Sequence, residues 1–199
     1  AEHGLAAYAM NAVELRALKN QGILPLRTRT ANLLPKDTIK AVDWIVRSAE
    51  GGHADAQYRL ATHYFFGDGV PKDVAKAISW IEQAAEQGHA QSQLNLAYSY
   101  EQGQGVDPNI DESLKWFKAA AESGNLEAQN ALAVIYQNGK GVPSNPEEAI
   151  RWYRRAADAG EPVAQFNLAY AYEHGVGVDE DIRQAIEWYR KSAKQGHAD

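Results

Sequence analysis

The sequence predicts an all-α fold, a solenoid of stacked helix-turn-helix units. Three observations carry this prediction: a pattern repeats every 36 residues, each repeat holds two helix-like stretches, and a Gly-x-Gly turn separates the two. A fixed period of 20–50 residues is typical of repeat proteins, whose units stack on their neighbours and bury one continuous core. We therefore interpret residues 1–199 as a single solenoid domain. The tryptophans all follow the period: Trp44, Trp80, Trp116, Trp152 and Trp188.

The first unit, residues 5–52, is irregular because it carries 12 more residues than the period. The stretch from Leu5 to about Asn20 is rich in Ala and Leu and predicts a helix. The extra residues fall in an insertion at 21–36, where glycine and prolines interrupt helical order. A second helix is expected to start near Asp37.

The four regular units span 53–88, 89–124, 125–160 and 161–196. In each unit the first helix carries a Leu-Ala-x-x-Tyr pattern, such as Leu132, Ala133 and Tyr136, whose spacing places the three side chains on one stripe. This helix ends at the first glycine of the Gly-x-Gly turn, because glycine adopts the positive φ that terminates a helix tightly.

The second helix of each regular unit begins at a predicted N-cap: Asp73, Asn109, Asn145 or Asp181. In three of the four units a Glu or Gln follows three residues later, which predicts a complete capping box. The tryptophan and an Ala-Ala or Ser-Ala pair come next, spaced to bury one stripe. A closing glycine is expected to end this helix.

Both ends of the chain fall inside the repeat pattern. Residues 1–4 resemble the end of a preceding repeat, and residues 197–199 resemble the start of a further one or a tail. Two interpretations stay open: a segment of a longer array, or degenerate terminal units. The role of the 21–36 insertion also has two interpretations. Its Arg27 and Arg29 lie in an otherwise acidic chain, as part of either a binding loop or a flexible surface loop.

Composition narrows the classes of partner. The formal net charge is −6, whereas duplex DNA and anionic membranes select basic surfaces, so no nucleic-acid partner is expected. There is no cysteine, hence no disulfide framework and no thiolate chemistry. No apolar run approaches the roughly 20 residues that span a bilayer, so direct membrane insertion is not expected. No signal peptide is expected within these residues.

The motif in full reads Ala-x-x-x-Leu-Ala-x-x-Tyr-x-x-Gly-x-Gly-Val, followed by Ala-(Ile/Leu)-x-Trp and Ala-Ala-x-x-Gly. It resembles the Sel-one-like repeat (SLR), a relative of the tetratricopeptide repeat, in all four regular units and in the second half of 5–52. The resemblance implies a right-handed superhelix and a non-enzymatic adaptor, assembly or regulatory role, in bacteria and often in the periplasm or outside the cell. Members with paired cysteines have been linked to β-lactam binding, which does not carry over to a chain without cysteine.

No constellation of residues predicts catalysis, a cofactor or a metal site. The tryptophans are interpreted as core packing within their own units rather than as ligand-stacking groups. His53, His89 and His197 share one repeat position, so stacking separates them by about one helix spacing, too far for a common metal. His63 and His174 are expected as single surface residues. The Gly-x-Gly turns lack the strand that a phosphate-binding fingerprint requires.

A stripe of the first helix that does not carry the Leu-Ala-Tyr pattern is expected to line the concave face of the solenoid. Leu94 also falls on this stripe by register. Asparagine and tyrosine suit the recognition of peptides, since an amide pairs with both backbone polar groups and a phenol adds contact area. The residues predicted to bind a partner are Tyr58, Asn95, Tyr98, Glu101, Asn130, Asn167, Tyr170 and Glu173.

Two functional hypotheses follow. The first is a non-enzymatic module that binds a protein or peptide partner on the concave face, of which an inhibitor or immunity-type protein is a special case. The second is a structural spacer in a larger repeat protein. An enzyme is disfavoured because no catalytic grouping stands out.

Overall fold

The protein is seen here as a computed structural model, which describes residues 35–196, with side chains from residue 41 onward. The helix predicted from Leu5, the insertion residues 21–34 and both arginines of that insertion lie outside the described residues. Helix α2 begins at Pro35, two residues before the predicted start. The described helices are α2 (Pro35–Glu50), α3 (Ala54–Phe66), α4 (Val74–Glu86), α5 (Ala90–Gln102), α6 (Ile110–Glu122), α7 (Leu126–Asn138), α8 (Pro146–Asp158), α9 (Pro162–His174) and α10 (Ile182–Lys194).

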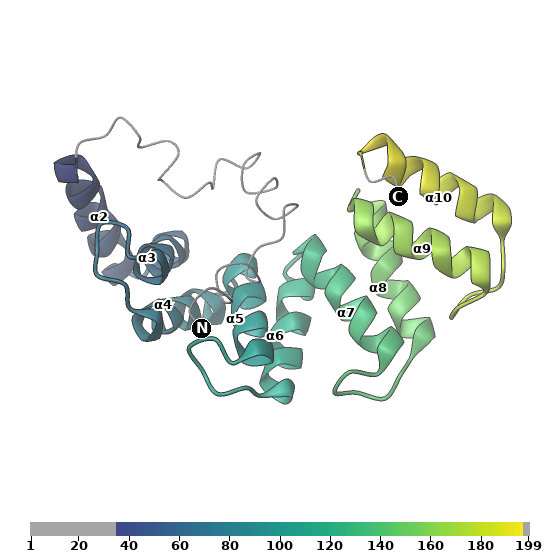
Figure 1. The fold of residues 1–199 in the computed structure, drawn as a ribbon, viewed down its shortest axis with the longest axis horizontal. Coiled ribbons are helices and arrows are strands. Elements are labelled where there is room, and N and C mark those ends of the chain that lie inside the picture. Colours follow the sequence, from purple (N-terminus) through teal and green to yellow (C-terminus); the bar gives the residue numbers. More distant parts are fainter. Residues whose placement is uncertain (1–34, 197–199) are drawn as a thin grey trace, which may run out of the picture.

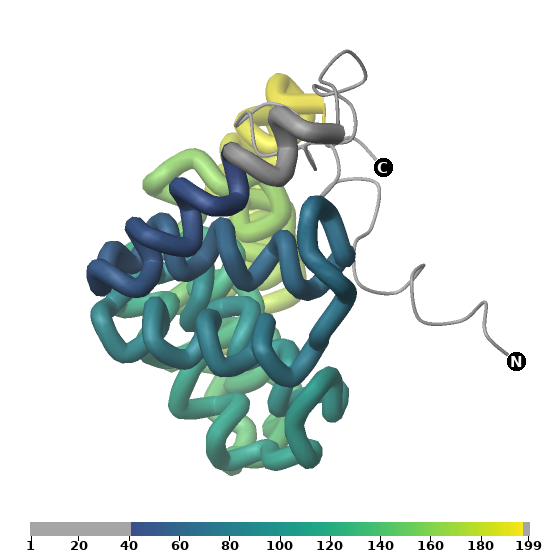
Figure 2. The backbone as a smooth tube through the Cα atoms, turned by 90° about the vertical axis from the view of Figure 1, so that its left-hand side faces the viewer, coloured from purple at the N-terminus to yellow at the C-terminus, as the bar shows by residue number. Residues whose placement is uncertain are grey.

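Each helix packs on the helices before and after it in the sequence. We call α3, α5, α7 and α9 the A helices, and α2, α4, α6, α8 and α10 the B helices. The units follow one another along an arc from α2 to α10 (Figure 1). Seen from the α2 end, successive units lie one behind another as coiled layers (Figure 2). The regular secondary structure of residues 35–196 consists of helices without a strand, which confirms the predicted α-solenoid.

The two glycines of each turn have different roles. Gly103 ends α5 with φ 71°, and its N–H donates to the Ser99 carbonyl, as predicted. The second glycine, Gly105, lies against the preceding B helix, where a Cβ would approach Val74 Cγ1 and Ile78 Cγ1 to 2.8 Å. The second glycine therefore lets the loop of one unit close onto the helix of the unit before it.

The predicted capping boxes form only in part. Asn145 Oδ1 accepts the Glu148 N–H at 3.0 Å, as expected of an N-cap. The N–H of Asn145, however, donates to the Tyr136 carbonyl at 2.8 Å, and the equivalent bond occurs in the other three regular units. The reciprocal half of the box was therefore wrong, because a carbonyl of the A helix already occupies that N–H. This bond ties the two helices of a unit together.

A buried glutamine near the start of every A helix joins it to the B helix before it. The side-chain amides of Gln57, Gln93, Gln129 and Gln165 donate to the carbonyls of Ala49, Ala85, Ala121 and Ala157 at 3.0–3.2 Å. These carbonyls belong to the last turn of a helix, where each also accepts the N–H of the glycine that closes the unit, at 2.9–3.2 Å. The glutamines therefore add a second hydrogen bond to a helix-end carbonyl at each junction between units.

The hydrophobic core runs from unit to unit, and three tryptophans lie at its junctions. Trp80, Trp116 and Trp152 are each partly buried and each contact two successive core clusters. Trp188 is 8 % exposed and Trp44 is 68 % exposed. The predicted core packing holds for Trp80, Trp116, Trp152 and Trp188 but not for Trp44. The restriction to one unit was wrong for the first three, whose indoles bridge two units.

Candidate partner-binding surface

The solvent-facing side of the A helices, here called the A-helix face, carries most of the residues predicted to bind a partner. Polar contacts cross this face between neighbouring units. Asn167 Nδ2 on α9 donates to Asn130 Oδ1 on α7 at 3.0 Å. The Tyr98 hydroxyl on α5 donates to Glu127 Oε1 on α7 at 3.2 Å. Residues of adjacent units thus meet across this face, although they do not occupy equivalent repeat positions.

The junction of α3 and α5 holds a second polar chain. Tyr58 hydrogen-bonds Asn95, and the Asn95 Oδ1 accepts from Gln91 Nε2 at 3.1 Å. Gln91 in turn accepts from Asn125, the N-cap of α7, at 3.3 Å. Burial raises the pKa of the Tyr58 phenol above its usual value, although the bond to Asn95 opposes the shift. This part of the face is therefore prearranged by bonds within the protein.

Between α5 and α7 the A-helix face is hollowed into a depression of about 250 Å³, here called the A-helix groove. Apolar side chains line one part of it and polar side chains the other, an arrangement typical of sites that bury a ligand group and fix its orientation. Three of the predicted residues come together there. Its lining comprises Tyr98, Glu101, Phe117, Glu127, Asn130, Ala131, Val134, Ile135 and Lys140.

Glu101 has a different partner from its counterparts in the other units. Its Oε1 accepts from Lys140 Nζ at 2.7 Å, whereas Gln137 accepts from the Tyr153 hydroxyl and Glu173 from the Tyr189 hydroxyl, both at 2.8 Å. The α6 residue equivalent to Tyr153 and Tyr189 is Phe117, which has no hydroxyl to donate. The carboxylate therefore pairs with a cation from the next unit.

The predicted residues differ in accessibility. Tyr170 is 44 % exposed and stacks on His174 with ring centroids 4.1 Å apart. Tyr98 is half-buried, with its ring edge against Phe117 at 5.0 Å. Replacing Tyr98 is consequently expected to disturb the core as well as the surface.

Two expectations about exposure were wrong. Leu94 is 1 % exposed and belongs to the core cluster that joins α5 to α6 and α7, because the buried stripe of an A helix is wider than the Leu-Ala-Tyr pattern. His63 is 4 % exposed, with its Nδ1 2.7 Å from the Asp68 carbonyl oxygen, so it holds the turn after α3. The exposure of His174 agrees with expectation.

The structure also brings together a Ser-His-Asp grouping that spacing did not indicate. His89 Nε2 lies 3.2 Å from Asp55 Oδ1, and His89 Nδ1 lies 2.8 Å from Ser92 Oγ. The serine is completely buried, so its hydroxyl is closed to a substrate in this conformation. His89 Nδ1 also accepts the Ser92 N–H at 3.2 Å. We interpret the group as the N-cap of α5, held in place by the carboxylate of the preceding unit.

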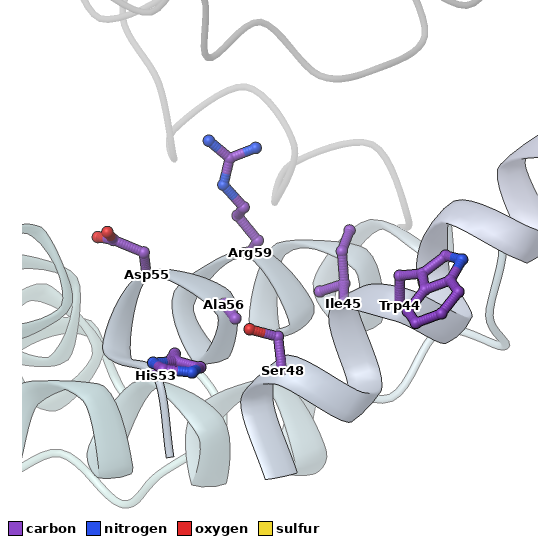
Figure 3. Close-up of a pocket in the computed structure, with 7 residues that line it drawn as sticks. All are labelled: Trp44, Ile45, Ser48, His53, Asp55, Ala56 and Arg59. Atoms are coloured by element: carbon purple, nitrogen blue, oxygen red, sulfur yellow. The ribbon is translucent and has the colours of Figure 1, made fainter. Parts of the chain in front are cut away.

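A second depression, of about 430 Å³, lies at the α2 end of the described array (Figure 3). Its lining combines an exposed indole and an aliphatic side chain from α2 with charged side chains of α3. Trp44 is exposed here because no earlier unit is among the described residues to cover it. The lining residues are Trp44, Ile45, Ser48, His53, Asp55, Ala56 and Arg59.

Reasoning from the repeat missed several residues of the A-helix groove. Lys140 is the middle residue of a Gly-x-Gly turn, which the pattern treats as variable. Glu127 is the second residue of α7, and Phe117 is a B-helix residue that follows the tryptophan of the repeat. One signal was available in the sequence. Gln137 is followed 16 residues later by Tyr153, which has a hydroxyl, whereas Glu101 is followed at the same spacing by Phe117, which has none.

Across 35–196, no three His, Asp or Glu side chains gather in a way that could hold a metal ion. In the same part of the chain, no helix combines the length and apolar character needed to cross a bilayer.

A family model for the Sel1 repeat, the Sel-one-like repeat of the sequence motif, matches residues 31–53, 54–89, 90–125, 126–161 and 162–197. The chain belongs to the Sel1 repeat family. No protein of curated function matches the sequence. Sel1 repeats generally serve as protein-interaction modules and non-catalytic scaffolds.

Three solved structures are similar to this one. A Sel1 repeat protein from Oxalobacter formigenes is 34 % identical, with a TM-score of 0.76, over 80 % of this chain and 46 % of that one. The protein c5321, a protective antigen present in uropathogenic Escherichia coli strains, is 34 % identical, with a TM-score of 0.78, over 92 % of this chain and 41 % of that one. Cysteine-rich protein B of Helicobacter pylori shares the fold, with 23 % identity and a TM-score of 0.50, over 63 % of this chain and 90 % of that one. The chain thus spans less than half the length of the first two.

Proposed function

We propose that this protein is a non-enzymatic interaction module that binds an extended segment of a protein partner along the A-helix face. The observation that carries the proposal is the A-helix groove. It joins an apolar floor to a polar rim on the solvent-facing side of α5 and α7. Val134, 36 % exposed, presents an aliphatic side chain within it. Asn130 and Asn167 extend the polar rim towards α9.

Extended peptides suit such a surface for a physical reason. Their backbone groups need hydrogen-bond partners every few ångströms, and amide side chains supply both a donor and an acceptor. Solenoids commonly use their long curved surfaces in this way. The binding free energy is expected to concentrate in the groove, where an anchoring side chain loses the most water.

The test uses a random peptide library displayed on phage and selected against the full chain. Selected peptides are then measured by calorimetry against wild type, Val134→Arg and Ile186→Arg. Val134→Arg fills the A-helix groove with a charged side chain, so binding is expected to weaken at least tenfold. Ile186 is 44 % exposed on α10 and does not line the groove, so Ile186→Arg is the matched control and should bind like wild type. Peptides that bind Val134→Arg as tightly as wild type contradict the proposal.

A further inference from the structure

We propose that the A-helix groove accepts an arginine side chain of the partner, with the Glu101 carboxylate as its counter-charge. In the free protein the Lys140 ammonium takes the place of that arginine and pairs with Glu101. This inference rests on the proposed function and names the side chain that the groove selects.

The ion pair in the groove has one fixed and one replaceable member. The Glu101 side chain is 19 % exposed and lies on α5, whereas the Lys140 side chain is 57 % exposed and comes from the loop after α7. Exposed ion pairs contribute little to stability, because water and salt screen them and a long side chain loses entropy in them. Displacing Lys140 therefore costs little, while Glu101 stays in position.

The repeat explains why Glu101 pairs with a lysine of the next unit, unlike its counterparts in the later units. At the two later units the equivalent side chains, Gln137 and Glu173, accept from a tyrosine hydroxyl of their own B helix. Phe117 stands at that position in the Glu101 unit and donates nothing. In the first regular unit the residue equivalent to Glu101 is Phe65, which has no polar group.

The groove matches the parts of an arginine side chain. The methylene stem can lie on Val134 and Ile135, which line the groove with Phe117. The planar guanidinium presents parallel N–H groups that fit a carboxylate in a bidentate manner, and it stacks on aromatic faces such as Tyr98.

The charge in the groove favours the same occupant. The charged side chains that line it are two carboxylates, Glu101 and Glu127, and one ammonium, that of Lys140. Once Lys140 is displaced, the lining carries two negative charges. An incoming acidic side chain would be repelled, whereas a guanidinium restores the balance.

The experiment measures the binding of capped five-residue peptides to the full chain by ¹⁵N NMR titration. The central residue is arginine, citrulline, lysine or glutamate between pairs of alanines. Citrulline keeps the shape of arginine without the charge. Arginine is expected to shift the amide signals of Ala131 and Val134 with an affinity at least about tenfold above citrulline, as charge-assisted hydrogen bonds imply. Glutamate is expected to give no shifts there.

Three variants assign the effect to particular side chains. Lys140→Ala removes the internal competitor, so the arginine peptide is expected to bind up to about fivefold more tightly. Glu101→Gln is expected to reduce arginine binding to the level of citrulline. Glu173→Gln makes the same chemical change on α9, away from the groove, and should leave binding unchanged. Amide spectra of each free variant check that the fold is retained.

The outcomes separate this inference from the proposed function. Equal binding of arginine and citrulline, or weaker arginine binding by Lys140→Ala, overturns the arginine assignment. If phage-selected peptides still lose affinity to Val134→Arg in that case, the groove remains a peptide site with a different preference. If selected peptides are also indifferent to Val134→Arg, both proposals fail.

Discussion

The side-chain amide of Gln195 donates to Gln165 Oε1 at 3.0 Å and thereby joins the end of α10 to the buried glutamine of α9. Gln87 makes the same bond to Gln57 at 2.6 Å. The two inner units have a serine and an alanine at the donor position, Ser123 and Ala159. The buried glutamines there, Gln93 and Gln129, keep the bond to the helix end but have an Oε1 without a hydrogen-bond partner. The inner junctions thus lack a bond that the outer junctions make.

Ala159→Gln is expected to stabilise the protein by supplying that bond to Gln129. The backbone at Ala159 has φ −79° and ψ 0°, close to the −81° and 3° of Gln87, so the new side chain starts from the same geometry. A net gain of about 0.5–1.5 kcal/mol is typical of one hydrogen bond to a buried acceptor. Chemical denaturation measures it. Ala159→Met adds a similar length without a donor, and an equal gain from that variant would assign the effect to packing.

Tryptophan-to-alanine substitutions are expected to depend on position within the array. Trp116 is packed between two core clusters, so Trp116→Ala should cost about 3 kcal/mol, the lower end of the range for buried aromatics. Trp44 is 68 % exposed, with Arg47 over its ring, and Trp44→Ala should cost less than about 1 kcal/mol. Thermal unfolding compares the two variants, and similar melting temperatures would contradict the assigned role of the indole at the junction.

The pH dependence of stability should contain a contribution from His89. Burial lowers the pKa of its imidazole, and the nearby Asp55 carboxylate only partly opposes this. The folded state therefore disfavours the protonated ring, and the unfolded state binds more protons as the pH falls below the ordinary histidine pKa of about 6.5. The contribution of the neutral His89 ring to stability is fully present above that pH, and it is lost as the pH falls through the lowered pKa.

His89→Asn isolates this contribution. Asparagine caps the equivalent helix in the next unit, where Asn125 Oδ1 accepts the Ala128 N–H at 2.9 Å, so the cap should survive the change. The free energy of unfolding of wild type and variant is measured at pH 8 and at pH 5. It should fall less between the two pH values in the variant than in wild type. Equal slopes would show that His89 does not contribute.

Tyr153→Phe should destabilise the protein although the ring is retained. The Tyr153 hydroxyl donates to Gln137 Oε1 at 2.8 Å, and the ring is 2 % exposed, so the variant removes a donor from a half-buried amide. A loss of about 1 kcal/mol is expected. Burial also raises the pKa of the Tyr153 phenol to about 12. Wild type should therefore lose stability as the pH rises above about 10, the ordinary tyrosine pKa. Urea unfolding of both proteins at increasing pH above that value tests whether the variant loses less stability.

The sequence by itself determined the repeat, the helices and their ends. These features depend on local interactions, namely the spacing of apolar residues, a side-chain cap at Asn145 and a positive φ at Gly103, which are encoded within a few neighbouring positions. Most of the A-helix face was predictable for the same reason, since the register of one helix fixes which residues share its side.

Only the tertiary structure decided how equivalent residues differ. Trp44 and Trp116 occupy one repeat position, yet one is exposed and the other lies between two clusters, because burial depends on the neighbouring unit rather than on the residue. Glu101 and Glu173 likewise share a position, but the first pairs with Lys140 and the second with a tyrosine hydroxyl. Those partners lie in the loop after α7 and on α10, 39 and 16 residues away in the sequence, and a local pattern does not show that they come close in space.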